Sequence, residues 1–462
     1  MRIAVIGAGI GGLAVAAGLQ RDGHEVEVLE ERAEPAATGS GLTLFGNAFA
    51  ALDVLGIGDR VRAVSSTSIA TMRAGHRAPD GARLATAPAS ATATLRSVHR
   101  AELHSALLAA LAPGSLRTGV TATIEDAGRG RVRIAGVGRS ADRPSTGSGG
   151  GVDRDAGRTD GAGAGGAGEP GPIDGAAARV AGAAGRIGGA GARADAGGPT
   201  REYDLVVAAD GIRSRARAAL GDDPGLRYSG YTAWRGVTAA PFDLAGEAGE
   251  TWGAGARFGL VPLPDGRVYW FATATAPAGF SPGDHRAEAA GLVAGWHAPI
   301  GALIAATAPD AVLRHDIHDL RRVPRRFTAG RAALLGDAAH AMTPDLGQGA
   351  GLAIEDAGAL VALLRAHSPD EALARYDALR RPRAVALHRR SRLMGRVGQW
   401  SNPLARGLRD ALLRATPPAA VGRAAASLQR WTPPAAPEAV GRRGAHDPPD
   451  DVRPPLDAGR GD

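Results

Sequence analysis

Residues 3–12 read IAVIGAGIGG, an apolar strand followed at once by a glycine-rich turn. The turn fits the dinucleotide fingerprint G-x-G-x-x-G, with Gly7, Gly9 and Gly12 at its three fixed positions. Gly7 permits the tight turn, Gly9 lets the backbone approach a pyrophosphate because it has no Cβ, and Gly12 allows the helix to pack close to the strand. Together with Gly11, these residues are predicted to hold a dinucleotide.

The residues that follow complete the motif. Residues 13–20 form an apolar helix, whose N-terminus presents N–H groups and a partial positive charge to phosphates. Residues 25–29 form a second strand, and Glu30 ends it, where a carboxylate can accept hydrogen bonds from ribose hydroxyls. Arg32 is a further cofactor-binding candidate. A second match, residues 161–166, has no strand before it and no helix after it, so we reject it as a product of low complexity.

The composition narrows the class of protein. The chain has 462 residues, enough for two domains, and no cysteine, which excludes disulfides, thiolate metal sites, iron–sulfur clusters and redox-active dithiols. Its net charge of +7 comes from arginines, which we interpret as scattered among acidic residues, so no nucleic-acid partner is predicted. No apolar run is long enough to span a bilayer, and the first strand leaves no room for a signal peptide before it. A cytoplasmic location is therefore expected.

Two regions differ from the rest of the chain. Residues 136–198 are almost entirely Gly, Ala, Arg, Asp, Ser and Pro, which cannot bury enough apolar surface to offset their ordering entropy, so a disordered insertion is predicted. It separates residues 131–134 from residues 203–209, which are expected to be neighbouring strands. Residues 228–320 show strand patterns bounded by Pro and Gly and hold four of the six tryptophans, which predicts a sheet-rich domain inserted into an α/β domain.

Two later motifs point to FAD as the dinucleotide. Residues 209–215 read ADGIRSR, and residues 335–344 read LGDAAHAMTP, followed by Gly347-Gln348-Gly349. In the second motif the Asp337 carboxylate can accept hydrogen bonds from ribityl hydroxyls, and the loop leads into a helix whose N-terminus would stabilise an anionic reduced flavin. In these motifs the chain resembles the class A flavoprotein monooxygenases, the single-component aromatic hydroxylases with the para-hydroxybenzoate hydroxylase fold.

The resemblance implies a set of cofactor residues. Gly41-Leu42 and Asn47 match the family's early flavin-side loop, and Arg100 matches an arginine that reaches the FAD pyrophosphate. The full predicted set is Gly7, Gly9, Gly11, Gly12, Glu30, Arg32, Arg100, Asp210, Gly211, Gly336, Asp337, Pro344, Gly347, Gln348 and Gly349. The chain departs from the family pattern at Asp345, where Asn is expected, and in its insertion, which has no counterpart there.

The resemblance also implies the architecture: an α/β, Rossmann-type FAD-binding domain with an inserted sheet-rich (α+β) substrate domain and a C-terminal helical segment. The FAD-binding domain is expected to comprise residues 1–70, 96–227 and 321–400, and the substrate domain residues 71–95 and 228–320. Residues 401–431 are expected to form a C-terminal helix, and residues 432–462 a disordered tail.

The implied activity is that of an NAD(P)H- and O2-dependent hydroxylase. NAD(P)H would reduce non-covalently bound FAD, and a flavin C4a-hydroperoxide would then hydroxylate a small phenolic or heteroaromatic substrate. Three alternatives stay open: an epoxidase, a non-oxygenating oxidoreductase of the same fold, and a non-catalytic flavin-binding protein. A monomer or homodimer is expected, and neither the substrate nor the choice between NADH and NADPH is fixed.

Some residues are weaker candidates. Tyr231, Trp234 and Arg235 could line the substrate pocket or belong to the sheet core. No metal is expected, because His315 and His318 lie three apart on a predicted strand and so face opposite sides. We interpret His340 as a structural part of its turn, favour Asp210 over Arg213 and Arg215 for the cofactor, and assign no catalytic residue.

Overall fold

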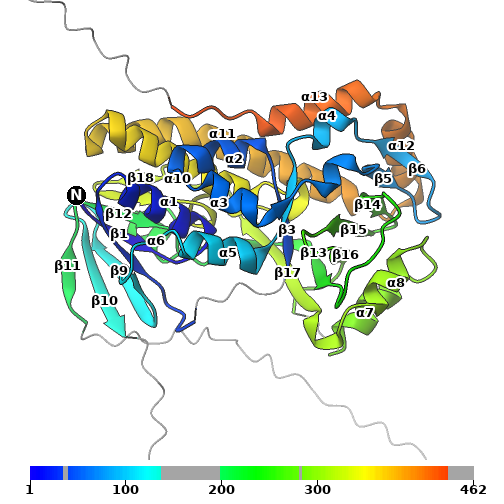
Figure 1. The fold of residues 1–462 in the computed structure, drawn as a ribbon, viewed down its shortest axis with the longest axis horizontal. Helices are drawn as coiled ribbons and strands as arrows, with labels where there is room; N and C mark the ends of the chain where they lie inside the picture. Colours follow the sequence, from blue (N-terminus) through cyan, green and yellow to red (C-terminus); the bar gives the residue numbers. More distant parts are fainter. Residues whose placement is uncertain (35–39, 137–197, 280–282, 435–462) are drawn as a thin grey trace, which may run out of the picture.

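The computed structural model describes residues 1–34, 40–136, 198–279 and 283–434, which form an α/β half and a sheet-rich half (Figure 1). Most of the predicted disordered insertion (137–197) and of the predicted disordered tail (435–462) lies outside the described residues. Within the described ranges, no helix is both long enough and apolar enough to cross a membrane.

The α/β half is built on a six-stranded sheet. Its strands are β1 (Arg2–Ile6), β2 (Glu25–Leu29), β8 (Leu116–Arg117), β12 (Leu205–Ala208), β18 (Thr328–Ala329) and β19 (Ala332–Leu334), in the order β18-β19-β12-β1-β2-β8. All neighbours are parallel except β18, which pairs antiparallel with β19. Every residue of β12 is buried, and so is every residue of β1 except the first. Such strands are buried because helices cover both faces of a parallel sheet.

Helices in this half are held close by small residues. The helices are α1 (Ile10–Arg21), α2 (Gly46–Leu55), α3 (Gly58–Ala63), α5 (Arg100–Leu108), α6 (Ala216–Ala219), α9 (Asp337–His340) and α10 (Gly349–Ala366). α1, α2 and α10 contact one another. A Cβ on Gly18 would meet Leu55 and Val361, so this glycine allows α1 to lie against the other two helices.

One predicted strand pairing is wrong. In a three-stranded sheet, β10 (Arg131–Gly136) lies between β9 (Val120–Asp126) and β11 (Thr200–Glu202), whereas residues 205–208 form β12 of the large sheet. The reason is burial: β12 is wholly apolar and needs cover on both faces, while β11 reads Thr-Arg-Glu and suits a partly exposed edge. Between them the Asp204 carboxylate accepts a hydrogen bond from the backbone of Arg2 at 2.7 Å, which sets β12 beside β1.

The sheet-rich half contains a seven-stranded sheet. Its strands are β5 (Gly75–Arg77), β6 (Arg83–Thr86), β13 (Leu226–Val237), β14 (Gly249–Trp252), β15 (Ala256–Pro262), β16 (Val268–Thr275) and β17 (Leu313–Leu320), in the order β17-β13-β16-β15-β14-β5-β6. A small sheet of β3 (Gly41–Leu44), β7 (Arg96–His99) and β4 (Ser65–Ser66) lies beside it, and β3 contacts β15 and β16.

The two faces of the seven-stranded sheet serve different neighbours. On the outer face, Trp234 and Trp270 pack with Leu303 in the core formed with α7 (His285–Leu292) and α8 (Ile300–Ala305). The inner face faces the α/β half and carries Tyr231, Ala233 and Arg235 of β13, Phe271 and Thr273 of β16, and Arg257 and Gly259 of β15, which the strand register places side by side. The inner face is therefore where the two halves meet.

The C-terminal helices join the halves. α11 (Pro369–Gly398) is a single helix of 30 residues that runs from the α/β half to the sheet-rich half (Figure 1). The segment expected to be one helix is two, α12 (Pro403–Ala415) and α13 (Pro418–Gln429), because Pro417 and Pro418 cannot continue the preceding hydrogen-bond ladder. The remaining short elements are α4 (Ala89–Thr92), η1 (Ser68–Thr71), η2 (Pro309–Ala311) and η3 (Pro344–Leu346).

Candidate flavin and substrate site

The predicted cofactor motifs converge on one edge of the six-stranded sheet. Gly7 follows β1, Glu30 follows β2, Asp210 follows β12 and Asp337 follows β19 within three residues of each strand's end. These four strands are adjacent and parallel, so their carboxyl ends share an edge. Ligands of open α/β sheets bind at this edge.

The three fingerprint glycines have different surroundings. A Cβ on Gly12 would overlap the carbonyl oxygen of Gly7, and a Cβ on Gly7 would overlap that of Ala209, so both positions require close packing. A Cβ on Gly9 would have no atom of the described residues within 4 Å, so these residues leave the space in front of Gly9 open. Gly9 is also the N-cap of α1 and supplies no capping side chain, which leaves the first turn of the helix free to bind an anion. Gly11 packs against Leu335 instead.

Glu30 is fixed at the end of β2. Its two carboxylate oxygens accept hydrogen bonds from the backbone N–H groups of Ala8 (2.7 Å) and Arg32 (2.9 Å). Each oxygen keeps a further lone pair, so the ribose interaction stays available. The side chains of Arg32 and Arg100 are exposed near this edge. The pKa of His315 on the inner face is lowered first by burial, then by the charge of Arg235 and then by that of Arg100, so Arg100 also lies close to the inner face.

The Asp-Gly motif is held by an arginine that the sequence analysis missed. One oxygen of Asp210 accepts hydrogen bonds from the backbone of Arg215 and Ala216, while Oδ1 is buried without a partner among the described residues. Arg217 is buried and donates to the carbonyl oxygens of Ile212 (2.6 Å) and Ala338 (3.2 Å), so it ties the Asp-Gly loop to the loop after β19. Arg213 and Arg215, by contrast, are exposed, and the sequence alone does not show which of the three arginines is buried.

The Gly-Asp motif rests on a buried polar network. Gly336 adopts φ 64°, which presents the exposed Asp337 at the sheet edge. Behind it, His340 contacts Asp356 at 2.6 Å, and Asp356 also accepts hydrogen bonds from Arg380 (2.7 Å) and from the backbone of Gly336 (3.0 Å). Burial tends to raise the pKa of Asp356, but His340 and Arg380 outweigh it and hold that pKa below its ordinary value. His340 is thus a structural anchor of the turn.

The loop before α10 leaves space and unused donors for a ring system. Gln348 accepts a hydrogen bond from Asn47 at 3.1 Å, which ties the loop to α2, and its Nε2 is buried without a partner among the described residues. Gly349 has open space where a Cβ would lie, and Gly347 has φ 63°. No acidic residue lies in the first turn of α10 and no side chain caps it, so its N-terminus can face a flavin carbonyl edge.

Asp345, the departure from the family pattern, forms a buried trio with two residues of the inner face. Its carboxylate pairs with the Arg257 guanidinium and accepts a hydrogen bond from the Tyr231 hydroxyl at 2.8 Å. Burial, and then the Asp345 charge, raise the pKa of Tyr231 well above its ordinary value, so Tyr231 stays a donor. Burial tends to lower the pKa of Arg257, but Glu250 and Asp345 outweigh it, and Arg257 stays charged.

The structure separates the three substrate-pocket candidates. Tyr231 and Arg235 lie on the inner face, where Arg235 donates to the Tyr269 hydroxyl at 2.6 Å. Trp234 was a wrong candidate: it lies on the outer face, and its indole N–H donates to Glu288 of α7 at 2.9 Å. Successive side chains of a strand point to opposite faces, so Trp234 cannot share the inner face with Tyr231 and Arg235. Arg257 was missed, although a lone charge in the apolar strand ARFGLVP is a usable signal.

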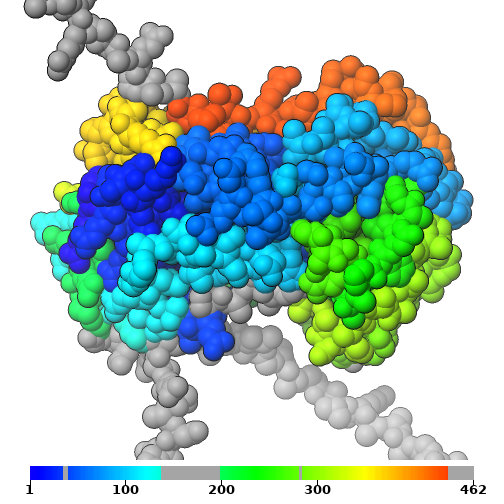
Figure 2. Space-filling model, viewed as in Figure 1, coloured from blue at the N-terminus to red at the C-terminus, as the bar shows by residue number. Residues whose placement is uncertain are grey.

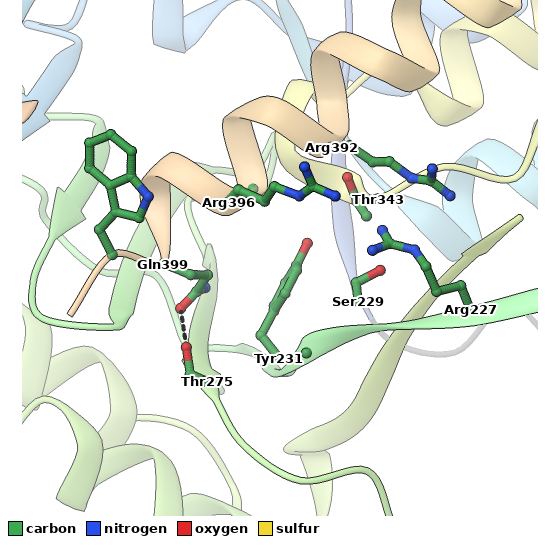
Figure 3. A pocket seen from close by; sticks show the side chains of 11 residues that line it. Arg227, Ser229, Tyr231, Thr275, Thr343, Arg392, Arg396 and Gln399 are labelled. Carbon is green, nitrogen blue, oxygen red and sulfur yellow. Dashed lines mark hydrogen bonds between the residues drawn. The ribbon is translucent and has the colours of Figure 1, made fainter. Parts of the chain in front are cut away.

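A cavity of about 370 Å³ lies next to the trio (Figure 3). Figure 3 shows Arg392 and Arg396 reaching it from α11, with Arg227, Ser229 and Tyr231 on β13. Arg227 and Arg392 both pair with the buried Asp319, so one carboxylate faces two guanidinium groups. The cavity therefore has an excess of positive charge.

These observations fit FAD. The open space at Gly9 and Gly349 suits a pyrophosphate and a flavin ring, and the unpartnered Oδ1 of Asp210 and Nε2 of Gln348 suit a ligand with many hydroxyl and carbonyl groups. The residues that would hold the cofactor are those at the sheet edge and the α1 and α10 N-termini.

Comparisons with known proteins agree with this assignment. Residues 192–391 match the FAD binding domain model, and residues 5–48 match the NAD(P)-binding Rossmann-like domain model. The 3-amino-4-hydroxybenzoate 2-monooxygenase of Streptomyces cremeus is 31% identical over 411 residues, 85% of this chain and 86% of that protein. This chain belongs to the family of single-component FAD-dependent aromatic monooxygenases.

Other relatives of this monooxygenase family match over shorter spans. An aurachin C monooxygenase/isomerase of Stigmatella aurantiaca is 49% identical over 220 residues, and a 2-heptyl-3-hydroxy-4(1H)-quinolone synthase of Pseudomonas aeruginosa is 36% identical over 225 residues. These alignments cover 46% and 48% of this chain but only 57% and 58% of the relatives. The crystal structure of Klebsiella pneumoniae HpxO with FAD and uric acid superposes with a TM-score of 0.72 and 27% identity, covering 93% of this chain and 96% of that one.

Proposed function

We propose that this protein uses NAD(P)H and O2 to hydroxylate an aromatic ring that carries an ionisable N–H or O–H group. The observation that supports this most directly is Asp345, whose carboxylate has no exposed surface and lies two residues before Gly347 of the flavin loop. Tyr231 donates to this carboxylate and lines the cavity, so a ring N–H or O–H can pass a proton to the Tyr231 hydroxyl while that hydroxyl passes its own proton to Asp345. Loss of the proton makes the ring more electron-rich and easier to oxygenate.

The chain's own residues would bind, orient and shield the reactants. When bound, FAD accepts two electrons from NAD(P)H and supplies activated oxygen for transfer to the substrate. Tyr231 and Arg257 hold the Asp345 carboxylate in place. The N-terminus of α10 would stabilise negative charge on the reduced flavin.

We infer a nitrogen heteroaromatic as the substrate class, with 4-quinolones bearing an apolar tail as the first choice. The relative named for heptyl-hydroxyquinolone synthesis is 36% identical, and the HpxO complex contains uric acid, another N–H heteroaromatic. Phe271, which is half-buried and lies against Gly259, offers apolar surface on the inner face beside the polar trio. Such a surface suits a ring with one polar edge and one apolar substituent.

The arginines around the cavity favour a second candidate, an aromatic acid. Arg227, Arg392 and Arg396 would attract a carboxylate, and the relative from Streptomyces cremeus is named for an aminohydroxybenzoate.

The test is a substrate panel with isotopic oxygen. The purified, FAD-saturated protein is assayed for NADH and NADPH oxidation with 2-alkyl-4-quinolones, urate and 3-amino-4-hydroxybenzoate, and the products are analysed after reaction under ¹⁸O2. We expect stimulated oxidation and a product that carries one labelled oxygen atom. Stimulation without label would indicate a non-oxygenating oxidoreductase, and an epoxide product would replace hydroxylation by epoxidation.

A further inference from the structure

α12 carries three of its leucines outward and one of its arginines, Arg409, inward. Leu404, Leu408 and Leu412 are spaced by four residues, lie on one side of the helix and are 85%, 58% and 59% exposed. The side that packs against the protein holds Arg409, which is 2% exposed. A helix on the surface of a globular domain normally has the reverse pattern.

The inward arginine fixes this orientation. The Arg409 guanidinium lies over the ring of Trp252 on the inner face, 5.4 Å from its centroid, and donates to the carbonyl oxygen of Gly253. It also pairs with Asp410 on the same helix at 2.8 Å. Since α12 turns Arg409 toward the protein, Leu404, Leu408 and Leu412 are left without a partner among the described residues.

The helices around the stripe form a strongly basic segment. Residues 383–434 contain ten arginines and one acidic residue, Asp410, whereas the whole chain has a net charge of only +7. Our interpretation of the arginines as scattered among acids is wrong for this segment. Six of its arginines are exposed and make no ion pair with a described residue: Arg389, Arg390, Arg396, Arg414, Arg423 and Arg430. Arg396 lines the cavity, so the other five are the ones that face outward from the segment. In Figure 2 this segment, coloured orange to red, forms the upper rim of the molecule.

We propose that this rim docks on an anionic phospholipid surface, with the leucine stripe of α12 in the headgroup–acyl boundary and the arginines on the headgroups. An amphipathic helix with leucines on one side and basic residues around it lies in the plane of a bilayer in this way. The docking is peripheral.

Two other occupants fit the rim less well. The leucine stripe lies on a 13-residue helix about 20 Å long and about 10 Å wide, an apolar footprint of roughly 200 Å², well below the roughly 800 Å² per partner of a stable dimer. A second copy that covered the whole rim would bring its arginines against like charges. Nucleic acids would use the arginines but not the leucines, since most protein contacts to nucleic acid go to phosphates. A bilayer uses both groups.

The docked helix lies next to the cavity. Gln399 and Trp400 line the cavity and come shortly before α12, which begins at Pro403. An apolar substrate dissolved in the bilayer would therefore reach the cavity beside the docked rim. This consequence rests on the proposed function, whereas the docking itself does not.

The test is co-sedimentation of the full-length, FAD-saturated protein with vesicles. The probes are phosphatidylcholine vesicles with and without phosphatidylglycerol, at low and high salt. We expect binding to the anionic vesicles that weakens with salt, and at least about tenfold weaker binding for L404S/L408S/L412S. The matched control is L379S, which removes an exposed leucine of α11 near the acidic residues Asp370, Glu371 and Asp377. It is expected to bind as the wild type does.

The outcomes are distinct. Equal binding of the wild type and the triple variant, or no binding of the wild type to anionic vesicles, overturns the proposal. The proposal is also overturned if the wild type is a dimer in sedimentation velocity and the triple variant is a monomer, because the stripe would then be an interface between two copies. Flavin content and unfolding temperature of the triple variant should match the wild type, since its three leucines are exposed. Docking with no oxygenation of any aromatic would leave this inference standing and reject the proposed function.

Discussion

Asp345 and Arg257 form an ion pair in which the two side chains are 0% and 2% exposed. The pair joins the loop before α10 to the inner face of the seven-stranded sheet, so it connects the flavin-binding half with the substrate half. A second acid, Glu250, lies 3.6 Å from Arg257, and Tyr231 donates to Asp345. Breaking such a buried pair leaves a charge without its partner, which costs more than the pair itself contributes.

Replacing Asp345 with the family's Asn tests this coupling. We expect D345N to lower the free energy of unfolding by about 1.5–3 kcal/mol, because Arg257 then keeps only Glu250 as an acidic partner. Substrate-stimulated NAD(P)H oxidation should fall at least about tenfold in kcat/KM, in the range expected for loss of a positioned proton acceptor. Urea denaturation and steady-state kinetics measure the two effects.

The double variant D345N/R257Q separates stability from chemistry. It removes both charges, so stability should return to within about 1 kcal/mol of the wild type. Activity should stay low, because the carboxylate is still missing. Recovery of activity along with stability would show that Asp345 acts only through the fold.

Gly395 of α11 tests how closely this helix must lie against the pair. A Cβ at Gly395 would overlap the Asp345 carboxylate, so G395A should displace either the helix or the carboxylate, with a loss of about 1–3 kcal/mol in stability and a marked rise in KM. Gly407 of α12 has no atom within 4 Å of its would-be Cβ. G407A is the matched control and should be neutral or stabilising by up to about 1 kcal/mol. A similar effect of the two substitutions on KM would contradict the close-packing role.

Gly9 and Gly12 should respond differently to alanine. The space at Gly9 is open, so G9A should leave the unfolding temperature of the FAD-free protein unchanged but weaken FAD binding at least about tenfold. G12A should destabilise the FAD-free protein, because its Cβ would overlap the carbonyl oxygen of Gly7. Flavin fluorescence titration and thermal unfolding of the apoprotein measure both. Unchanged FAD affinity in G9A would show that the pyrophosphate lies elsewhere.

The sequence was sufficient to predict the fold of the N-terminal βαβ unit because the pattern that defines this unit is local. Gly7, Gly9, Gly12 and Glu30 lie within one βαβ unit, where the strand and helix follow directly from apolar patterning. The Asp210 and Asp337 motifs could be placed at the same sheet edge because parallel strands end together. The pairing of residues 203–209 failed, since β11 and β12 differ in burial rather than in strand propensity.

The site in the substrate half was harder to predict from the sequence because it combines distant strands and a helix. Tyr231, Arg257 and Asp345 come from three separate segments, and only the register of β13, β16 and β15 shows which side chains share a face. The choice of Trp234 as a pocket candidate illustrates this limit. A tryptophan suits a pocket, but its position along β13 places it on the outer face of the sheet. Arg217 and Arg409 were missed because a buried arginine looks like any other arginine in a sequence rich in them.

His388 of α11 should make stability sensitive to acid in a defined window. Burial, and then Arg392, lower the pKa of this imidazole from 6.5 to about 4, and its Nε2 lies 3.1 Å from the carbonyl oxygen of Leu320. The unfolded chain therefore takes up a proton at a higher pH than the folded chain does. The stability from neutral His388 is fully present above pH 6.5 and is lost as the pH falls toward 4. H388Q keeps an N–H donor for Leu320 and has no such titration, so its urea midpoint should fall less than that of the wild type between these two pH values. Parallel curves for the two proteins would mean that His388 is already protonated in the folded state.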